Sequence, residues 1–316
     1  MAALVRIGLV GAGSMGTRHA HVVSSSELAT LDVVVDADPA RAARLTSQFG
    51  GRAAASVEEV LGCDAVIIAS TTATHADIAL QVIAAGRPVL VEKPMSEDLA
   101  QTIAVVAASR DAGVVLMCGF VERFNAVVAA LTTAMEEPPV HIVALRHSPQ
   151  NPRTVSSVVH DLLIHDVDIA LRLNPGRAVV GVTGATWTPP GSPSAEVADC
   201  TLRFDDGTIA TLSASRAGQR KVRTMQVDTG RALFELDLLR QNLTVYRHLR
   251  QSLTLDGASY RAETMVDIPF VRHTGEPLGL QLAHFIGLLS ADAARVEAER
   301  GSILGPHRVV ADIAGS

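Results

Sequence analysis

Residues 5–16 read VRIGLVGAGSMG, an apolar run that leads directly into a glycine-rich turn. The three glycines are spaced G-x-G-x-x-G, a pattern that is informative when it follows a strand and opens a helix. Both conditions hold here, because Leu4–Val10 is almost continuously apolar, as buried parallel strands are, and Met15–Ser24 has a helical pattern. The stretch therefore predicts the first strand–turn–helix unit of a doubly wound α/β domain.

Each glycine of this turn has a physical role in holding a dinucleotide. Gly11 allows the tight turn, Gly13 lets the backbone approach a pyrophosphate, and Gly16 permits close packing of the helix on the strand. The helix N-terminus, which includes Ser14 and Met15, offers N–H donors and a positive dipole end to the phosphates. We therefore expect all five residues to bind a dinucleotide cofactor; the alternative is a glycine turn that holds no ligand.

Asp36 stands at the end of the second predicted strand, 20 residues beyond Gly16. A carboxylate at that place binds the ribose hydroxyls of the cofactor and repels a 2′-phosphate. Asp36 therefore favours NAD over NADP, unless it is only a turn residue.

Strand and helix signals alternate through the first 120 residues. The apolar runs that predict parallel strands are Leu4–Val10, Leu31–Val35, Ala65–Ala69, Pro88–Val91 and Val114–Cys118. The intervening stretches that predict helices are Met15–Ser24, Pro39–Phe49, Ser56–Leu61, His75–Ala85 and Leu99–Ala112. We therefore expect residues 1–120 to form an N-terminal Rossmann domain with a doubly wound parallel sheet.

The pattern changes in residues 121–316, where a strand-rich stretch lies between helical signals. The predicted helices are Ala126–Met135, Ser156–Leu173 and Leu278–Ala291. The predicted strands are Val140–His147, Cys200–Phe204, Ile209–Ser213, Val222–Thr229, Ala232–Leu236 and Thr244–Leu249. Consecutive strands with few helices between them predict a C-terminal α+β domain with a largely antiparallel, open sheet.

Composition excludes several classes of function. The 316 residues carry a net charge of −6 and only 3% aromatic side chains, so we expect neither nucleic-acid binding nor attachment to an anionic membrane. The three cysteines are widely separated, which predicts neither a disulfide framework nor a metal site. The apolar N-terminus leads into the glycine turn and no apolar run reaches about 18 residues, so we expect a cytoplasmic protein.

Lysine is scarce in this chain: of the 27 basic residues 25 are arginine, and only Lys93 and Lys221 are lysine. Lys93 lies in the tripeptide Glu92-Lys93-Pro94, directly after the fourth apolar strand. Ligands of open α/β sheets bind beyond the carboxyl ends of the strands. This position favours a functional lysine over a solvated one, since an ordinary surface cation of this chain is an arginine.

A polar stripe is predicted on the long helix of the second domain. Asp161, His165 and Asp168 are spaced i, i+4 and i+7, and so share one helical face. A stripe of carboxylate, imidazole and carboxylate suits proton transfer, although a metal site or an exposed polar face has the same pattern. His160 lies off this face, which weakens the metal interpretation.

Together these residues resemble the Gfo/Idh/MocA oxidoreductases, which include glucose–fructose oxidoreductase and inositol dehydrogenase. The resemblance covers essentially the whole chain and rests on these motifs: GAGSMG, STTATH at 70–75, Glu92-Lys93-Pro94, Gly119-Phe120 with Arg123-Phe124, and Asp161-x3-His165-Asp166. The resemblance implies an NAD(P)-dependent enzyme that transfers hydride to or from a sugar, cyclitol or related alcohol. It also implies a C-terminal sheet used for oligomer contacts, and hence a homodimer or homotetramer.

The resemblance assigns roles to individual residues. Lys93 and His165 resemble the catalytic pair, and Asp161 resembles their partner in holding the substrate hydroxyl. Besides the glycine turn and Asp36, the residues implied to contact the cofactor are Ser70, Thr71, His75, Glu92, Lys93 and Arg123. The stretches VERFN (121–125) and HDLLIHDVD (160–168) most resemble the branch that acts on amino sugars and nucleotide-linked sugars.

Four positions bear on substrate detail. Thr71 stands where the family usually has proline, and Ala126 where proline is common in that branch. His160 replaces a usually apolar residue, and either faces the substrate or is a paired core histidine. Arg153, just upstream of the helix, is expected to pair with an anionic substrate group or else to be a surface arginine.

The leading hypothesis is an NAD-dependent dehydrogenase of a sugar, amino sugar, nucleotide sugar or cyclitol. One alternative is an NAD-dependent glycosidase, in which transient oxidation labilises the glycosidic bond. The other is a non-catalytic NAD-binding sensor, whose mark in the sequence would be the loss of Lys93 or His165; both are present.

Overall fold

The computed structural model describes residues 3–150, 156–250 and 262–315. They form two compact units, of which the first contains the chain up to Val121 together with Gly275–Ala311. The second contains Glu122–Thr274 together with the residues from Asp312 onward. The expected division into residues 1–120 and 121–316 differs from these units, because Gly275–Ala311 packs with the N-terminal segment.

The first unit contains a six-stranded sheet in the order β3-β2-β1-β4-β5-β6, and all its neighbouring strands are parallel. Its strands are β1 (Val5–Val10), β2 (Ala29–Val35), β3 (Arg52–Ala54), β4 (Ala65–Ile68), β5 (Val89–Glu92) and β6 (Leu116–Gly119). The predicted doubly wound sheet is therefore confirmed. The sequence does not predict the edge strand β3, because its three residues are largely exposed and contain no apolar run.

Helices connect these strands and follow them at the end of the chain. They are α1 (Ser14–Ser24), α2 (Pro39–Phe49), α3 (Thr72–Ala84), α4 (Leu99–Asp111), α7 (Pro277–Leu288), α8 (Ala293–Gly301) and α9 (Leu304–Ala314). Asp38 and Asp98 cap α2 and α4, each accepting a hydrogen bond from a first-turn backbone N–H. The helix predicted over Ser56–Leu61 is instead a short 3₁₀ helix, η1 (Val57–Gly62), since six residues make fewer than two α-helical turns.

The second unit contains an eight-stranded sheet in the order β14-β13-β12-β11-β7-β10-β9-β8. Its strands are β7 (His141–His147), β8 (Val179–Trp187), β9 (Val197–Phe204), β10 (Ile209–Ser215), β11 (Val222–Asp228), β12 (Leu233–Asp237), β13 (Asn242–Arg250) and β14 (Ala262–Asp267). Only β7 and β10 pair in parallel, so the predicted α+β class and largely antiparallel sheet are confirmed.

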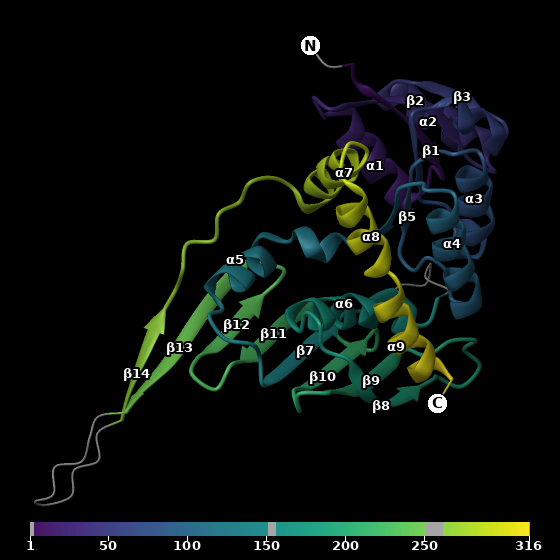
Figure 1. The fold of residues 1–316 in the computed structure, drawn as a ribbon. Coiled ribbons are helices and arrows are strands. Elements are labelled where there is room, and N and C mark those ends of the chain that lie inside the picture. The colour runs from purple at the N-terminus through teal and green to yellow at the C-terminus, as the bar shows by residue number, and fades with distance from the viewer. Residues whose placement is uncertain (1–2, 151–155, 251–261, 316) are drawn as a thin grey trace, which may run out of the picture. The chain divides into compact units, whose positions relative to one another are not determined.

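Two helices, α5 (Ala126–Ala134) and α6 (Ile164–Leu173), pack on one face of this sheet, as Figure 1 shows. Strand β7 alternates accordingly: Ile142, Ala144 and Arg146 are buried, whereas Val143 and Leu145 are more exposed. The long helix predicted over Ser156–Leu173 is interrupted, because its first part is a π turn, η3 (Val159–Leu163).

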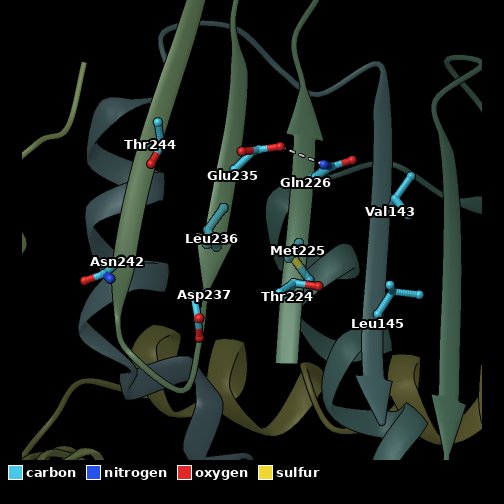
Figure 2. Close-up of a pocket in the computed structure, with 10 residues that line it drawn as sticks. All are labelled: Val143, Leu145, Thr224, Met225, Gln226, Glu235, Leu236, Asp237, Asn242 and Thr244. Atoms are coloured by element: carbon cyan, nitrogen blue, oxygen red, sulfur yellow. Dashed lines mark hydrogen bonds between the residues drawn. The ribbon is translucent and has the colours of Figure 1, made fainter. Parts of the chain in front are cut away.

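Figure 2 shows the second face of the same sheet, where side chains from neighbouring strands stand in rows. In one row Glu235 lies opposite Gln226, which lies opposite Val143, and Glu235 accepts a 2.8 Å hydrogen bond from the Gln226 amide. We call this surface the open face of the second unit, because large apolar side chains on it are exposed, including Leu145 at 39%.

Within the three described stretches, the structure contains no helix with the length and apolar character that a membrane span requires.

Candidate active site

In the glycine turn after β1, two of the three glycines have no room for a side chain and the third has open space beside it. Gly11 has a φ of +101°, and a Cβ there would lie 2.5 Å from the Ala69 backbone. A Cβ at Gly16 would lie 1.8 Å from the carbonyl oxygen of Gly11, so no side chain fits. Around Gly13, in contrast, a Cβ would meet nothing within 4 Å. The turn therefore packs tightly against its own unit and presents bare backbone to open space at Gly13.

The first turn of α1 is suited to an anion. Gly13 is its N-cap residue, which makes no side-chain capping bond, and no acidic residue occurs in the first turn. The N–H groups that begin a helix have no partner inside it, and they carry the positive end of the helix dipole. A dinucleotide pyrophosphate fits this terminus in both charge and hydrogen bonding.

Asp36, just after β2, is held beside the glycine turn. Its Oδ2 accepts a 2.6 Å hydrogen bond from the backbone N–H of Ala12, and its Oδ1 accepts one of 2.8 Å from Asp38. The carboxylate is only partly buried. It therefore retains the acceptor capacity that a ribose diol requires, and the turn and Asp36 together fit a dinucleotide.

Lys93 follows the carboxyl end of β5 and is half-buried. The residue before it, Glu92, is buried, and its Oε1 accepts a 2.7 Å hydrogen bond from Nε2 of His19 in α1. The residue after it, Pro94, has its carbonyl oxygen 2.9 Å from Nδ1 of His75. Glu92 and His75, both expected at the cofactor, thus have partners inside the protein.

His75 also connects this segment with the loop after β4. Its Nε2 lies 3.2 Å from the carbonyl oxygen of Ser70, whose hydroxyl lies 2.8 Å from that of Thr74. Thr71, the third expected cofactor residue of the loop, is the exposed N-cap of α3. His19 was not among the predicted site residues; its signal in the sequence is an imidazole on the buried face of α1, where a polar group needs a partner.

In the second unit the three residues of the predicted stripe lie in two different elements, Asp161 in η3 and both His165 and Asp168 in α6. Asp161 lies in the π turn η3, a conformation that is frequent at functional sites, and its side chain is 29% exposed. His165 is the second residue of α6 and is buried, as is His160 in the turn. Arg216, at the end of β10, places Nη1 3.5 Å from Oδ2 of Asp161.

Asp168 does not belong to a proton-transfer stripe, which corrects the interpretation from i, i+4, i+7 spacing. It forms a buried bidentate ion pair with Arg123, with 2.9 Å from Nε to Oδ2 and 2.6 Å from Nη2 to Oδ1. Arg123 itself, in the 3₁₀ turn η2 (Val121–Phe124), was expected at the cofactor and directs these two nitrogens at Asp168. The pair ties η2 to α6.

A second buried cluster holds α6 against the sheet. Arg146 on β7 donates to both oxygens of Asp166 at 2.8 Å and to Glu122 at 2.8 Å. Burial alone would lower the pKa of Arg146, but the two carboxylates raise it above its ordinary value. Burial opposes ionisation of Glu122, yet the Arg146 charge holds the pKa of that carboxyl below its usual range.

Sequence reasoning missed Arg146, although the alternation of β7 puts it on the buried face with Ile142 and Ala144. Of the remaining predicted residues, Arg153 lies outside the described part of the chain. Lys93 belongs to the first unit, and Asp161 and His165 belong to the second. Among the described residues, no group of three or more His, Cys, Asp or Glu side chains has an arrangement that would hold a metal ion.

These features define a class: a protein with a Rossmann-type dinucleotide-binding unit and a second α+β unit. Residues 5–120 match the family described as "Oxidoreductase family, NAD-binding Rossmann fold", and residues 127–232 match the "GFO/IDH/MocA C-terminal domain". The chain belongs to the Gfo/Idh/MocA oxidoreductase family.

Relatives of the chain within that family include dehydrogenases. The chain is 28% identical over 293 residues to UDP-N-acetylglucosamine 3-dehydrogenase of Acidithiobacillus ferrooxidans, a match that covers 91% of this chain and 89% of that protein. It is 33% identical over 229 residues to myo-inositol dehydrogenase Hyg17 of Streptomyces leeuwenhoekii, covering 66% and 69% of the two chains. The solved structure of the A. ferrooxidans enzyme, GnnA, matches with a TM-score of 0.82 and 26% identity over 99% of both chains.

Proposed function

We propose that this protein is an NAD-dependent dehydrogenase that oxidises a secondary hydroxyl of a sugar, amino sugar, nucleotide sugar or cyclitol, or reduces the corresponding ketone. The observation that carries the proposal is Lys93: one of two lysines in the chain, it follows the carboxyl end of β5 in the same unit as the open glycine turn. Relatives that act on UDP-N-acetylglucosamine and on inositol support the substrate class.

NAD is the proposed cofactor rather than NADP. Asp36 lies at the turn with its carboxylate hydrogen-bonded to two backbone N–H groups, and it is ready to accept from ribose hydroxyls. A 2′-phosphate at that place would meet a like charge. Bound nicotinamide supplies the hydride acceptor, and the chain's own residues must handle the hydroxyl proton and the charge on oxygen.

In this proposal His165 accepts the hydroxyl proton and returns it in the reverse direction, as an imidazole does near neutral pH. The Lys93 ammonium stabilises the negative charge that develops on the substrate oxygen. Asp161 orients these groups from the π turn η3, where Arg216 approaches its carboxylate. Arg153 is proposed to meet an anionic substrate group.

The test is a pair of lysine variants assayed for NADH formation with UDP-N-acetylglucosamine, amino sugars and inositols. Lys93→Met is expected to lower turnover about 100-fold or more while NAD affinity stays within about twofold, a size typical of acid–base and electrostatic terms. Lys221→Met changes the only other lysine, which is exposed, and is the matched control. Near-normal turnover of Lys93→Met would refute the assignment.

The glycosidase alternative has a different product signature. A glycosidase that uses transient oxidation recycles its cofactor, so substrate turnover without net NADH would favour it. The proposed dehydrogenase releases one NADH for each hydroxyl oxidised.

The proposal also includes a homodimer or homotetramer formed through the open face. Strand pairing puts four exposed apolar side chains on this face, one each from β7, β8, β10 and β14: Leu145, Trp187, Ile209 and Val266. A second copy of the chain packed on this face would remove these apolar side chains from water. Leu145→Arg is expected to lower the mass measured by light scattering, whereas Ile103→Arg, an exposed apolar position on α4, is not.

A further inference from the structure

We propose that three buried histidines, His19, His75 and His307, form a histidine clamp that positions Lys93. Each one bonds to a different residue of the segment 92–95: Glu92, Pro94 and Met95. The three come from α1, α3 and α9, and all are at most 2% exposed. This inference rests on the proposed role of Lys93 and names the residues that position it.

His19 fixes the strand end before the lysine. Its Nε2–H donates to Glu92 Oε1 over 2.7 Å, and both side chains are buried. A Cβ on Gly119, the neighbour of Glu92 on β6, would come within 3.0 Å of the carboxylate. The absence of a side chain at Gly119 therefore gives the carboxylate the room to meet His19.

His307 fixes the residue two places beyond the lysine, although 212 positions separate it from Met95. The Met95 backbone N–H donates to Nε2 of His307 over 2.9 Å, so that nitrogen must carry a lone pair. The proton is then on Nδ1, which donates to the carbonyl oxygen of Ile303 over 2.7 Å. The ring also packs against Phe120, with centroids 5.8 Å apart.

His75 lies between these two contacts and links the segment to the loop after β4. Its ring nitrogens lie 2.9 Å and 3.2 Å from the carbonyl oxygens of Pro94 and Ser70. The clamp therefore connects Lys93 to α1, the helix that follows the glycine turn, and to the loop that precedes α3.

Such a clamp has a physical purpose at a lysine that follows a strand end. A backbone shift of about 1 Å at a reacting group is enough to cost about 100-fold in rate. Buried hydrogen bonds on both sides of Lys93 limit that shift, because leaving any of these polar groups unsatisfied is costly. The clamp is thus a set of positioning residues, and none of the three histidines is assigned a chemical step.

The test compares variants that remove each bond with variants that restore it. The bonds are removed in His19→Leu, His75→Leu and His307→Leu. They are restored in the amide variants His19→Gln, His307→Gln and His75→Asn. A glutamine amide lies at the place of Nε2, and an asparagine amide lies at the place of Nδ1. Each leucine variant is expected to lose about 10- to 100-fold in kcat with NAD affinity within about threefold. The amide variants are expected to recover most of kcat.

His284→Leu is the matched control. His284 forms a 3.0 Å bond to Glu299 in the same unit, between α7 and α8, so its loss removes a histidine–glutamate pair away from Lys93, although the His284 side chain is 28% exposed and the clamp histidines are buried. Its kcat is expected to stay within about twofold of the wild type. His307→Phe keeps a ring against Phe120 without the hydrogen bonds, and it replaces His307→Leu if the leucine variant does not fold.

A second measurement is independent of turnover. The chain has only two lysines, so reductive methylation with ¹³C-formaldehyde gives two lysine NMR signals, which Lys93→Met and Lys221→Met identify. The Lys93 signal is expected to shift or broaden in the leucine variants and to return in the amide variants, while the Lys221 signal stays constant. A Lys93 signal unchanged in all three leucine variants would overturn the clamp. If the wild type forms no NADH with any substrate, the proposed function fails, and the NMR comparison still decides the clamp.

Discussion

The contrast between Gly13 and Gly16 gives a sharp test of the dinucleotide site. Gly13→Ala adds a methyl group where nothing lies within 4 Å, at an extended backbone conformation with φ −76° and ψ −161° that any residue adopts. The free energy of unfolding should therefore change by less than about 1 kcal/mol, because the smaller unfolded-state entropy offsets the weaker N-cap preference of alanine.

NAD binding should respond quite differently. The methyl group blocks the approach of a phosphate to the α1 terminus, and one lost hydrogen bond to a charged group is worth about 1.5–3 kcal/mol. The dissociation constant for NAD, measured by calorimetry, should therefore rise about 10- to 150-fold. Gly16→Ala should instead lower the free energy of unfolding by about 1–3 kcal/mol or more, since its Cβ would lie 1.8 Å from the Gly11 oxygen.

Gly62→Ala is the control for adding a methyl group in open space away from the turn, because nothing lies within 4 Å of that Cβ either. Gly62→Ala should change the free energy of unfolding by less than about 1 kcal/mol and the NAD dissociation constant by less than about twofold. A Gly13→Ala protein that binds NAD as the wild type does would refute the site. So would one that loses as much stability as Gly16→Ala.

Three further predictions concern the buried charges and thiols. Arg146→Met should lower the unfolding free energy by about 3–5 kcal/mol in urea titrations, because it removes the arginine partner of the buried Asp166 and leaves Glu122 with Arg223 alone as its arginine partner. Arg231→Met, at an arginine 84% exposed, should cost less than about 1 kcal/mol. The pKa of Glu122 is lower in the folded protein than in the unfolded chain, where it is about 4.3. The ionised carboxylate therefore stabilises the folded state above the unfolded pKa, and this stabilisation is lost as pH falls through the folded pKa. Glu122→Gln should accordingly show a smaller change of unfolding free energy with pH between about pH 6 and pH 3, as urea titrations would measure. Burial raises the pKa of the Cys63 thiol to about 11 and that of Cys200 to about 12, so iodoacetamide at about pH 8 should modify neither in the folded protein, as mass spectrometry would detect.

The parallel sheet is predictable from sequence because its strands are buried on both faces and so appear as continuous apolar runs. β4, β5 and β6 have this character and are entirely buried, and β1 is buried over its last four residues. β3 lacks it, since a short edge strand has one partner and an exposed side. Local pattern therefore identifies the interior of a sheet better than its edges.

The π turn at Val159–Leu163 could not be predicted from the spacing of polar residues. An i, i+4, i+7 stripe assumes 3.6 residues in every turn, and a π turn closes hydrogen bonds five residues apart. The register of Asp161 relative to Asp168 therefore differs from the assumed one. Asp168 pairs with Arg123, a partner 45 residues earlier that no periodicity within the helix indicates.

The histidine contacts show the same limit more strongly. His19 meets Glu92 across 73 positions, and His307 meets Met95 across 212. Sequence predicts that a buried imidazole has a partner but not which one, because the partner depends on how α1 and α9 pack. The motif Glu92-Lys93-Pro94 was nevertheless recognisable, since it directly follows a strand whose end is predictable.

Arginine and lysine have different roles in this chain. Arg146 and Arg123 are buried in bidentate pairs with carboxylates, a geometry that the planar guanidinium fork matches and an ammonium does not. Lysine, a compact point charge, is kept at position 93. Lys93→Arg should therefore fail to restore turnover, leaving less than about a tenth of the wild-type kcat even though the charge is retained, because the longer fork places its charge over several atoms. Steady-state assays of Lys93→Arg beside Lys221→Arg would measure this, and equal activity of the two would show that charge alone matters at position 93.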